Sequence, residues 1–318
     1  MAKTNHWGAL AAAAGTVVAV GLVLLIMLVV VEAQPAEATF PGKSGKIAYQ
    51  GDDGNDREIY TIKPGGGGKV KVTDNSTEDY DPSYSPSGNK IVYSGLEGPT
   101  GDREIYTINA GGGGKVQLTD NTTNDDESSY SPSGNKIVYS GRDGPTGDYE
   151  IYTINAGGGG KVQLTDNTTG DYAPSYSPSG KKIVYSGLEG PTGDREIYTI
   201  NAGGGGRFNV TDNATYEYYS SYSPSGKKIA YEGEDGVNGD FEIYTINAGG
   251  GGKVQLTDNS TDDGGDLSYS PSGKKIAYSG EEGANGDYEI YTIKPGGGGK
   301  VQLTDNDTGD YAPSWGSS

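Results

Sequence analysis

The chain has 318 residues and is acidic, with 43 acidic against 24 basic residues and a net charge of −19. This balance argues against a nucleic-acid binder, which needs a basic face. Cysteine is absent and the only histidine is His6, so disulfides, thiolate sites and histidine-based catalysis or metal binding are excluded from the rest of the chain.

A long apolar segment lies near the N-terminus. Trp7 to Val31 contains no charged residue and is preceded by Lys3. As a helix it would cross a hydrocarbon core of about 30 Å, and the preceding positive charge predicts export of everything downstream. The small-x-small sequence Ala36-Glu37-Ala38 fits a cleavage site. Residues 1–38 are therefore a signal peptide or an N-terminal membrane anchor with a short linker, and both remain open.

Residues 39–318 form one domain built from a repeat. The motif Lys-Ile-(Ala/Val)-Tyr recurs at intervals of 44 to 47 residues. Its isoleucines are Ile47, Ile91, Ile137, Ile183, Ile229 and Ile276. Six units of this period indicate a propeller or a solenoid.

Each unit predicts four short strands, A to D. In the second full unit these are 128–130, 136–140, 150–154 and 161–164, with β-branched and aromatic residues bounded by Gly, Asn, Asp, Ser and Pro. Strand C has large side chains on both faces, as expected for a strand in a sheet that is covered on both sides. Strand D alternates Val162 and Leu164 with Lys161 and Gln163, so we expect an edge strand with one wet face. No helical period occurs after residue 40.

The ends of the repeat predict how the ring closes. The first unit begins at strand B, Lys46 to Tyr49, and the chain finishes on a strand A, Asp310 to Trp315. Together they complete one blade. The fold class is therefore all-β, a six-bladed propeller of four-stranded antiparallel blades closed by the C-terminal strand.

The repeat resembles a known family. Pro-Ser-Tyr-Ser-Pro-Ser-Gly-Lys-Lys-Ile-Val-Tyr at 174–185, followed by Glu-Ile-Tyr-Thr-Ile-Asn-Ala at 196–202, is similar to TolB-like, WD-repeat-like propellers of the Ser-Pro-Asp-Gly type. Tyrosine replaces the family's tryptophan except at Trp315, and serine replaces aspartate in the turn. The resemblance implies the fold. It leaves activity open, because the family includes envelope binding proteins and propeller domains of peptidases and lyases.

The charges segregate by segment. Acidic residues of the repeats lie in or beside the B–C and D–A connections, which share one face of a propeller. Of the basic residues, only Arg57, Arg103, Arg142 and Arg195 lie there, and the others flank A–B and C–D turns. We expect an acidic face opposite a basic one, suited to a cation or a basic partner or merely to solvation.

Three repeated motifs have candidate roles. Asp143 to Glu150 places several carboxylates on a glycine-rich loop that could bind Ca²⁺, although Asp148 and Glu150 could equally cap turn amides. The Gly-Gly-Gly-Gly-Lys segment at 111–115 is a hairpin turn, because no helix follows it as in a phosphate-binding loop. Asn-x-Thr triplets begin at Asn75, Asn121, Asn167, Asn213, Asn259 and Asn306. A turn role is favoured over glycosylation for them.

Two sets stand out among the 25 tyrosines. Those of strand B (Tyr93, Tyr139, Tyr185, Tyr231) and strand C (Tyr106, Tyr152, Tyr198) are expected to pack between blades. Six others depart from the repeat near the channel mouth, where they pack in loops or form an aromatic rim. They are Tyr80, Tyr172, Tyr216, Tyr218, Tyr219 and Tyr311.

The leading functional hypothesis is an exported, monomeric, non-catalytic interaction module of the cell envelope. Its partner, an envelope protein or a glycan, would bind at the acidic channel mouth, with no catalytic residue and no cofactor beyond a Ca²⁺ ion. One alternative is a polysaccharide lyase or glycosidase using paired carboxylates, although no single acid stands out from the repeat. The other is a passive structural or adhesive envelope protein. Membrane contact is expected only through residues 1–38.

Overall fold

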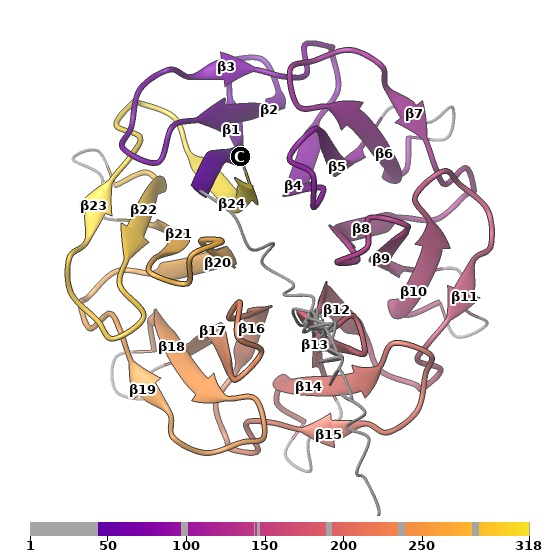
Figure 1. Ribbon diagram of the computed structural model, residues 1–318, viewed down its shortest axis with the longest axis vertical. Coiled ribbons are helices and arrows are strands. Elements are labelled where there is room, and N and C mark those ends of the chain that lie inside the picture. Colours follow the sequence, from indigo (N-terminus) through magenta and orange to yellow (C-terminus); the bar gives the residue numbers. More distant parts are fainter. Residues whose placement is uncertain are drawn as a thin grey trace, which may run out of the picture. The chain divides into compact units, whose positions relative to one another are not determined.

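A computed structural model describes residues 44–317 of the chain, except 97–100, 143, 145–146, 189–192, 235–238 and 282–285. These residues form six four-stranded antiparallel sheets arranged as blades around a central axis (Figure 1). The predicted six-bladed propeller is confirmed. The apolar segment before residue 39 and the predicted domain boundary lie outside the described residues. Within them there is no helix, and so none that could span a membrane.

Each blade runs outward from the channel in the order A, B, C, D. The A strands are β4 (Asp79–Tyr84), β8 (Asp125–Tyr130), β12 (Asp171–Tyr176), β16 (Glu217–Tyr222), β20 (Asp263–Tyr269) and β24 (Asp310–Ser317). The B strands are β1 (Ser44–Asp52), β5 (Lys90–Gly95), β9 (Lys136–Gly141), β13 (Lys182–Gly187), β17 (Lys228–Glu234) and β21 (Ile276–Gly280).

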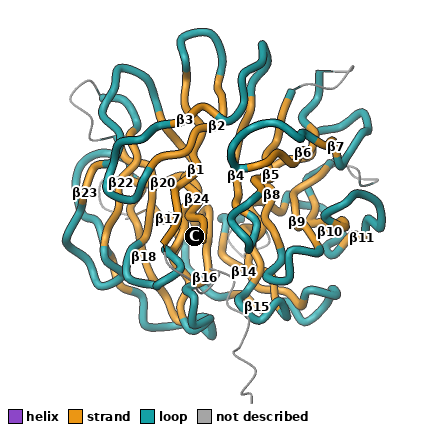
Figure 2. The backbone as a smooth tube through the Cα atoms, turned by 45° about the horizontal axis from the view of Figure 1, so that its top comes forward, coloured by secondary structure: helices purple, strands orange, loops and turns teal. Residues whose placement is uncertain are grey.

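The outer half of each blade holds strands C and D. The C strands are β2 (Arg57–Ile62), β6 (Glu104–Asn109), β10 (Glu150–Asn155), β14 (Glu196–Asn201), β18 (Phe241–Asn247) and β22 (Glu289–Ile293). The D strands are β3 (Val70–Lys71), β7 (Val116–Gln117), β11 (Val162–Gln163), β15 (Phe208–Asn209), β19 (Val254–Gln255) and β23 (Val301–Gln302). Because neighbouring strands are antiparallel, the B–C and D–A connections share one face (Figure 2).

Blade 1 closes the ring as predicted. Its sheet has the order β24-β1-β2-β3, so the last strand of the chain is its innermost strand. Ile47 pairs with Trp315, and Gly51 pairs with Asp310. Blades 2 to 6 then follow in chain order, each made of four consecutive strands.

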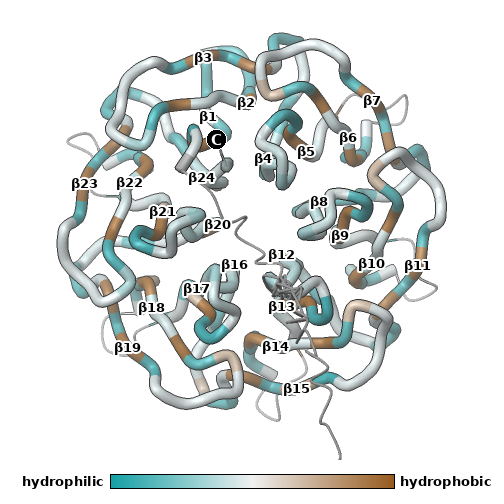
Figure 3. Tube along the Cα trace, in the orientation of Figure 1, coloured by the Kyte–Doolittle hydropathy of each residue, from teal (hydrophilic) through white to brown (hydrophobic). Residues whose placement is uncertain are grey.

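The core lies between blades, on strands B and C, where the most hydrophobic positions gather (Figure 3). Val92 and Ile105 of blade 2 pack against Ile137 and Tyr139 of blade 3. Within each blade the two tyrosines stack, with ring centroids 5.6 Å apart for Tyr139 and Tyr152. Such a pair adds about 0.5–1.5 kcal/mol beyond its buried area, so the predicted packing role of these tyrosines is confirmed.

Strand D is the edge strand of each blade, as predicted, but its length and the burial of its valine differ from the prediction. It has only two residues in each blade, and Val162 is 48% exposed instead of buried. The cause is the preceding turn, in which Gly158, Gly159 and Gly160 all have positive φ and carry the chain across the outer edge. The predicted hairpin role of the glycine runs is thereby confirmed.

Candidate functional site

The Asn-x-Thr triplets join neighbouring blades. The Asn75 backbone N–H donates to Glu58 Oε1 at 2.7 Å, and its side-chain Nδ2 donates to Asp79 Oδ2 at 2.8 Å. The Asn75 Oδ1 accepts the Thr77 N–H at 2.7 Å, which forms an Asx turn. Both ends of the asparagine amide are thus committed to structure. The favoured turn role is confirmed.

This network recurs at every junction and buries two carboxyl groups there. The acids that begin strands A and C are all exposed by 1% or less. They are Glu58, Asp79, Glu104, Asp125, Glu150, Asp171, Glu196, Glu217, Glu242, Asp263, Glu289 and Asp310. The predicted acidic face therefore does not include these twelve acids, which are buried between the blades and hydrogen-bonded by the asparagines.

Burial shifts the titration of these acids. It raises the pKa of Asp79, Asp125 and Asp171 to about 7. It raises that of Asp310 to about 6 and that of Glu217 to about 8. The carboxyl group of the preceding blade adds to the shift, since two negative charges in a poorly hydrated site repel. The junction acids therefore act in structure, not in ligand binding.

The six A strands surround a central cavity of about 100 Å³. Each strand is interrupted by a bulge, such as the one between Tyr80 and Ser83. At the bulge a non-glycine residue takes a positive φ in five of the six blades. These residues are Asp81, Glu127, Ala173, Tyr219 and Ala312. Since this conformation costs about 1–3 kcal/mol for such residues, its recurrence around one cavity marks a candidate site.

Three acids line the cavity and are not part of the repeat: Asp81, Glu127 and Asp266. Burial and the nearby carboxylates of Asp266 and Glu127 raise the pKa of Asp81 well above its usual range. Burial, Glu127 and Glu232 raise the pKa of Asp266 to about 8. The expectation that no acid stands out from the repeat is wrong. A cation entering this cavity would relieve the repulsion between these groups.

Glu127 is held in place within this cluster. Its Oε2 accepts hydrogen bonds from the Ser140 hydroxyl at 3.0 Å and from the Ala173 N–H at 2.7 Å. The Asp81 N–H donates to Gln50 Oε1 at 2.9 Å, which fixes the equivalent bulge. No hydrogen bond or ion pair to the carboxylates of Asp81 and Asp266 is found within the described residues, so both remain open to a ligand.

Half-buried tyrosine and arginine side chains surround the mouth on the B–C and D–A face. The Arg57 guanidinium lies 5.6 Å from the Tyr80 ring and 5.5 Å from the Tyr311 ring. Arg195 lies 4.2 Å from the Tyr172 ring and 4.6 Å from the Tyr218 ring. Such stacking explains why the basic residues around this mouth are arginines.

The rim is discontinuous. Tyr172 also contacts Tyr149 at 5.0 Å between ring centroids, and Tyr218 meets the Phe241 edge at 5.7 Å. In blade 6, Gly264 stands where four other blades have a tyrosine and blade 3 has Asp126, so the aromatic rim opens beside Asp266. Of the other non-repeating tyrosines, Tyr216 is exposed and Tyr219 lies near the channel acids, which raise its pKa further.

The loop predicted to hold Ca²⁺ is only partly described, since Asp143 lies outside the described residues. Glu150 is buried and its Oε1 accepts the Asn167 N–H at 2.8 Å, in agreement with the capping role. The sequence signal for Asp81 and Glu127 was their position as the third residue of strand A, which is Ala in two other blades.

Comparisons with known proteins agree with this architecture. The family model described as PD40, TolB beta propeller domain, matches residues 144–318. TolB from Acinetobacter baumannii is 21% identical with a TM-score of 0.74, over 87% of this chain and 67% of that one. A putative TolB from Agrobacterium tumefaciens is 18% identical with a TM-score of 0.64, over 84% and 96%.

A third similar structure is hydrazine synthase from Kuenenia stuttgartiensis, at 16% identity and a TM-score of 0.70, over 86% of this chain and 47% of that one. At these identities the structural likeness shows the fold alone. A comparison with curated proteins found no match.

Proposed function

This chain belongs to the TolB β-propeller family, and from that premise we propose that it is an exported, non-catalytic interaction module of the cell envelope. Its channel takes a cationic side chain of a partner protein. Residues 1–38 serve as its export signal or membrane anchor. The observation that carries the proposal is the group of three carboxyls, Asp81, Glu127 and Asp266, that line the central cavity.

The size of the cavity favours a side chain over a larger ligand. Small-molecule sites usually occupy roughly 300–1,000 Å³, whereas this cavity measures about 100 Å³. A lysine or arginine side chain matches that volume and supplies the missing positive charge. The surrounding aromatic and guanidinium groups give the rest of a peptide a surface for stacking and hydrogen bonding.

Fluorescence anisotropy with labelled hexalysine and hexaglutamate tests the charge preference of the full chain, in Ca²⁺-free buffer. We expect hexalysine to bind and hexaglutamate not to bind. The double variant Asp81→Asn/Asp266→Asn should weaken hexalysine binding by about tenfold or more, since each 1.4 kcal/mol is tenfold. The matched control, Asp120→Asn/Asp166→Asn, removes the same charge from exposed positions. Equal losses in both variants would sink the proposal.

A pull-down from the native host's envelope then tests the partner, with the same two variants as baits. A stoichiometric partner that is retained by the control and lost by the channel variant supports the interaction module. A partner retained by all baits would place the binding surface elsewhere.

The channel acids also favour a second candidate, a carbohydrate-active enzyme. A carboxyl with a pKa of about 8 beside other carboxylates resembles an acid–base pair of a glycosidase. Under the leading proposal, no polysaccharide in a panel is cleaved. Cleavage that is abolished by Asp266→Asn would establish the enzyme instead.

A further inference from the structure

The face of the propeller opposite the aromatic channel mouth carries only positive charge within the described residues. It consists of the A–B and C–D turns and the strand ends beside them, and we call it the basic face. Seventeen basic residues lie there, and no aspartate or glutamate does. They are Lys46, Lys63, Lys69, Lys90, Lys115, Lys136, Lys161, Lys181, Lys182, Arg207, Lys227, Lys228, Lys253, Lys274, Lys275, Lys294 and Lys300.

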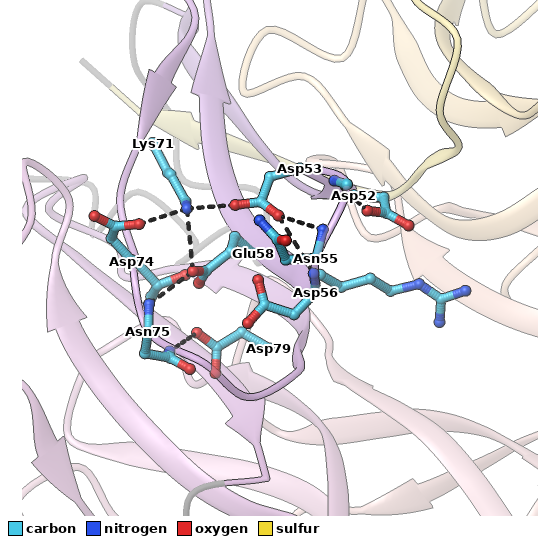
Figure 4. Close-up of polar contacts among 12 residues, drawn as sticks. Asp52, Asp53, Asn55, Asp56, Glu58, Lys71, Asp74, Asn75 and Asp79 are labelled. Carbon is cyan, nitrogen blue, oxygen red and sulfur yellow. Dashed lines mark hydrogen bonds and ion pairs between the residues drawn. The ribbon is translucent and has the colours of Figure 1, made fainter.

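Basic side chains near the opposite face are neutralised by carboxylates. Lys71 Nζ lies 2.6 Å from Asp74 Oδ1, 2.8 Å from Asp53 Oδ2 and 3.3 Å from Glu58 Oε1 (Figure 4). These hydrogen bonds hold the pKa of Lys71 above its usual range. An ammonium group of this protein is therefore paired wherever the fold places acids beside it.

The A–B turns of the basic face lack such partners. Lys181, Lys227 and Lys274 are exposed, and within the described part of the chain none of them forms an ion pair. The turns themselves are well fixed. Ser177 Oγ, for example, accepts the Lys182 N–H at 3.0 Å. The turns thus hold uncompensated positive charges at defined positions around the ring.

Exposed hydrophobic side chains border this face at the outer edge. They follow the basic residue that precedes each strand D, and they are 39–48% exposed. They are Val70, Val116, Val162, Phe208, Val254 and Val301. Val162 lines a groove together with Ser133 and Lys136 of the basic face. Charge and apolar area therefore occur together, as they do on surfaces that contact lipid headgroups.

The chain enters the propeller on the same face. β1 begins at Ser44, which pairs with Ser317, and runs from the basic face toward the opposite one. Only residues 32–43 separate it from Val31, the end of the apolar segment. Fully extended, they reach about 40 Å. A retained anchor would therefore keep the basic face, and not the channel mouth, within that distance of the membrane.

An anionic bilayer supplies the counter-charge that the basic face lacks. The net charge of −19 does not prevent contact, because the Debye length of about 8 Å at physiological ionic strength limits the interaction to the nearest face. Each basic residue near an anionic surface strengthens binding by about fivefold. The seventeen residues are spread over all six blades, which suits an extended surface better than a small anion. We propose that the basic face docks on an anionic lipid bilayer.

This inference goes beyond the proposed function and beyond the predicted membrane contact through residues 1–38. It concerns the face opposite the aromatic channel mouth and does not depend on the ligand of the channel. Docking in this orientation turns the mouth away from the lipid, toward a partner protein.

The repeat itself supplies a variant that keeps the fold. Blades 4, 5 and 6 have Lys181, Lys227 and Lys274 where blades 2 and 3 have Asn89 and Asn135. The backbone is equivalent, since Lys181 O accepts the Ala202 N–H at 2.9 Å and Asn89 O accepts the Ala110 N–H at 2.9 Å. The triple variant Lys181→Asn/Lys227→Asn/Lys274→Asn therefore copies a turn that the chain already contains.

The matched control makes the same change in net charge on the opposite face. Ser76→Asp/Thr122→Asp/Thr168→Asp adds three negative charges at exposed positions of D–A connections. Blade 6 already has an aspartate, Asp307, at the equivalent position. A general effect of net charge would appear in both triple variants alike.

Fluorescence quenching tests the docking with the full chain reconstituted into vesicles. One set of vesicles is an equal mixture of phosphatidylcholine and phosphatidylglycerol, the other is phosphatidylcholine alone, and both contain a lipid with a nitroxide headgroup in each leaflet. Because the chain has no cysteine, Ser133→Cys gives a single fluorescent label on the basic face and Ser260→Cys one on the opposite face.

We expect quenching of the label at residue 133 in the anionic vesicles, and not at residue 260. Pure phosphatidylcholine controls for tethering by the apolar segment and should give little quenching. The lysine triple variant should lower the ratio of docked to undocked chains by about tenfold or more, since three charges at about fivefold each are lost. The control variant should change it by less than about twofold, because its charges lie farther than a Debye length from the lipid.

The proposal is overturned if quenching at residue 133 is the same in both lipids, or if both triple variants lose it equally. It is also overturned if the basic face binds the acidic residues of a second copy instead. Sedimentation would then show self-association that the lysine triple variant abolishes, with no dependence on phosphatidylglycerol. Hexalysine binding should be unchanged in that variant, so failure here leaves the proposed function standing.

Discussion

Blades 1 and 5 use the same strand order to solve two charge problems differently. Blade 1 places Lys71 on strand D beside Glu58 and Asp74, whereas blade 5 has Gln255 at the same register. At the junction, strand A begins with Asp310 in blade 1 and with the longer Glu217 in blade 5. The hydrogen bond from the preceding asparagine is present in both, at 2.9 and 2.7 Å. The hydrogen bonds at the blade junction are therefore the same in both blades, whereas the charged residues around the buried acids differ.

The glycine beside the junction acid should give the largest difference between the two blades. A Cβ at Gly51 would lie 2.5 Å from Asp310 Oδ1, whereas at Gly233 the nearest atoms are 3.3 Å away or more. We expect Gly51→Ala to destabilise the chain by about 3 kcal/mol and Gly233→Ala by much less. Urea unfolding of both variants measures the difference. Equal losses would show that the length of the junction acid is irrelevant.

Removing the internal cation should have the next largest effect. Lys71→Met leaves the buried Glu58 facing two aspartates, and we expect a loss of about 2 kcal/mol, less than for a fully buried pair because Lys71 is 27% exposed. Gln255→Met, the matched change in blade 5, should cost little in Ca²⁺-free buffer. A similar loss for both would show that Lys71 contributes packing and not charge.

The pH dependence of stability should separate the two junction acids. Burial raises the pKa of Glu217 to about 8 and that of Asp310 to about 6. An acid whose pKa is raised by burial binds its proton more tightly in the folded state. Its contribution to stability is therefore present below pH 4 and is lost as the pH rises through these values.

The stability of the wild type should therefore fall up to about pH 8 as Glu217 ionises, and Glu217→Gln should remove this fall. Asp310→Asn should remove a fall in stability that ends near pH 6. Each pKa unit corresponds to about 1.4 kcal/mol, and we expect an effect of that order for Glu217. Chemical unfolding from pH 4 to pH 9 measures it. Parallel profiles for wild type and Glu217→Gln would contradict the assignment.

The smallest effect is expected for the exposed aspartate beside Lys71. Asp74 is 84% exposed, so Asp74→Asn should change the free energy of unfolding by about 0.5 kcal/mol or less. Asp258→Asn in blade 5 should have an equally small effect, because Asp258 is also exposed. A larger loss in either variant would assign that aspartate a structural role instead.

The blades and the closure of the ring could be predicted from the sequence because the repeat recurs six times. Six copies of the isoleucine motif and two complementary ends predicted the blades and their closure, and Thr77 following Asn75 predicted the turn. The burial of Asp79 could not be predicted, since acids in polar loops are normally solvated and only the asparagine bond draws this one inward.

The channel site was missed for a related reason. Whether Asp81 faces the cavity depends on a bulge at the third residue of strand A, and an ordinary strand would alternate its side chains differently. The bulge residue is Asp, Glu, Ala, Tyr or Gly in different blades, so the bulge cannot be recognised in the sequence from the residue type. Comparing that single column across the six repeats would have revealed Asp81 and Glu127, but not Asp266, which follows the bulge residue Gly265.

The pairing of β1 with β24 has a consequence for how the protein is made. Ile47 finds its partner Trp315 only after all the intervening blades have been synthesised. Until then β1 presents an unpaired inner edge that any other strand can join, and such distant contacts form slowly. During synthesis, the interval before this last pairing is therefore when the chain is most prone to aggregation.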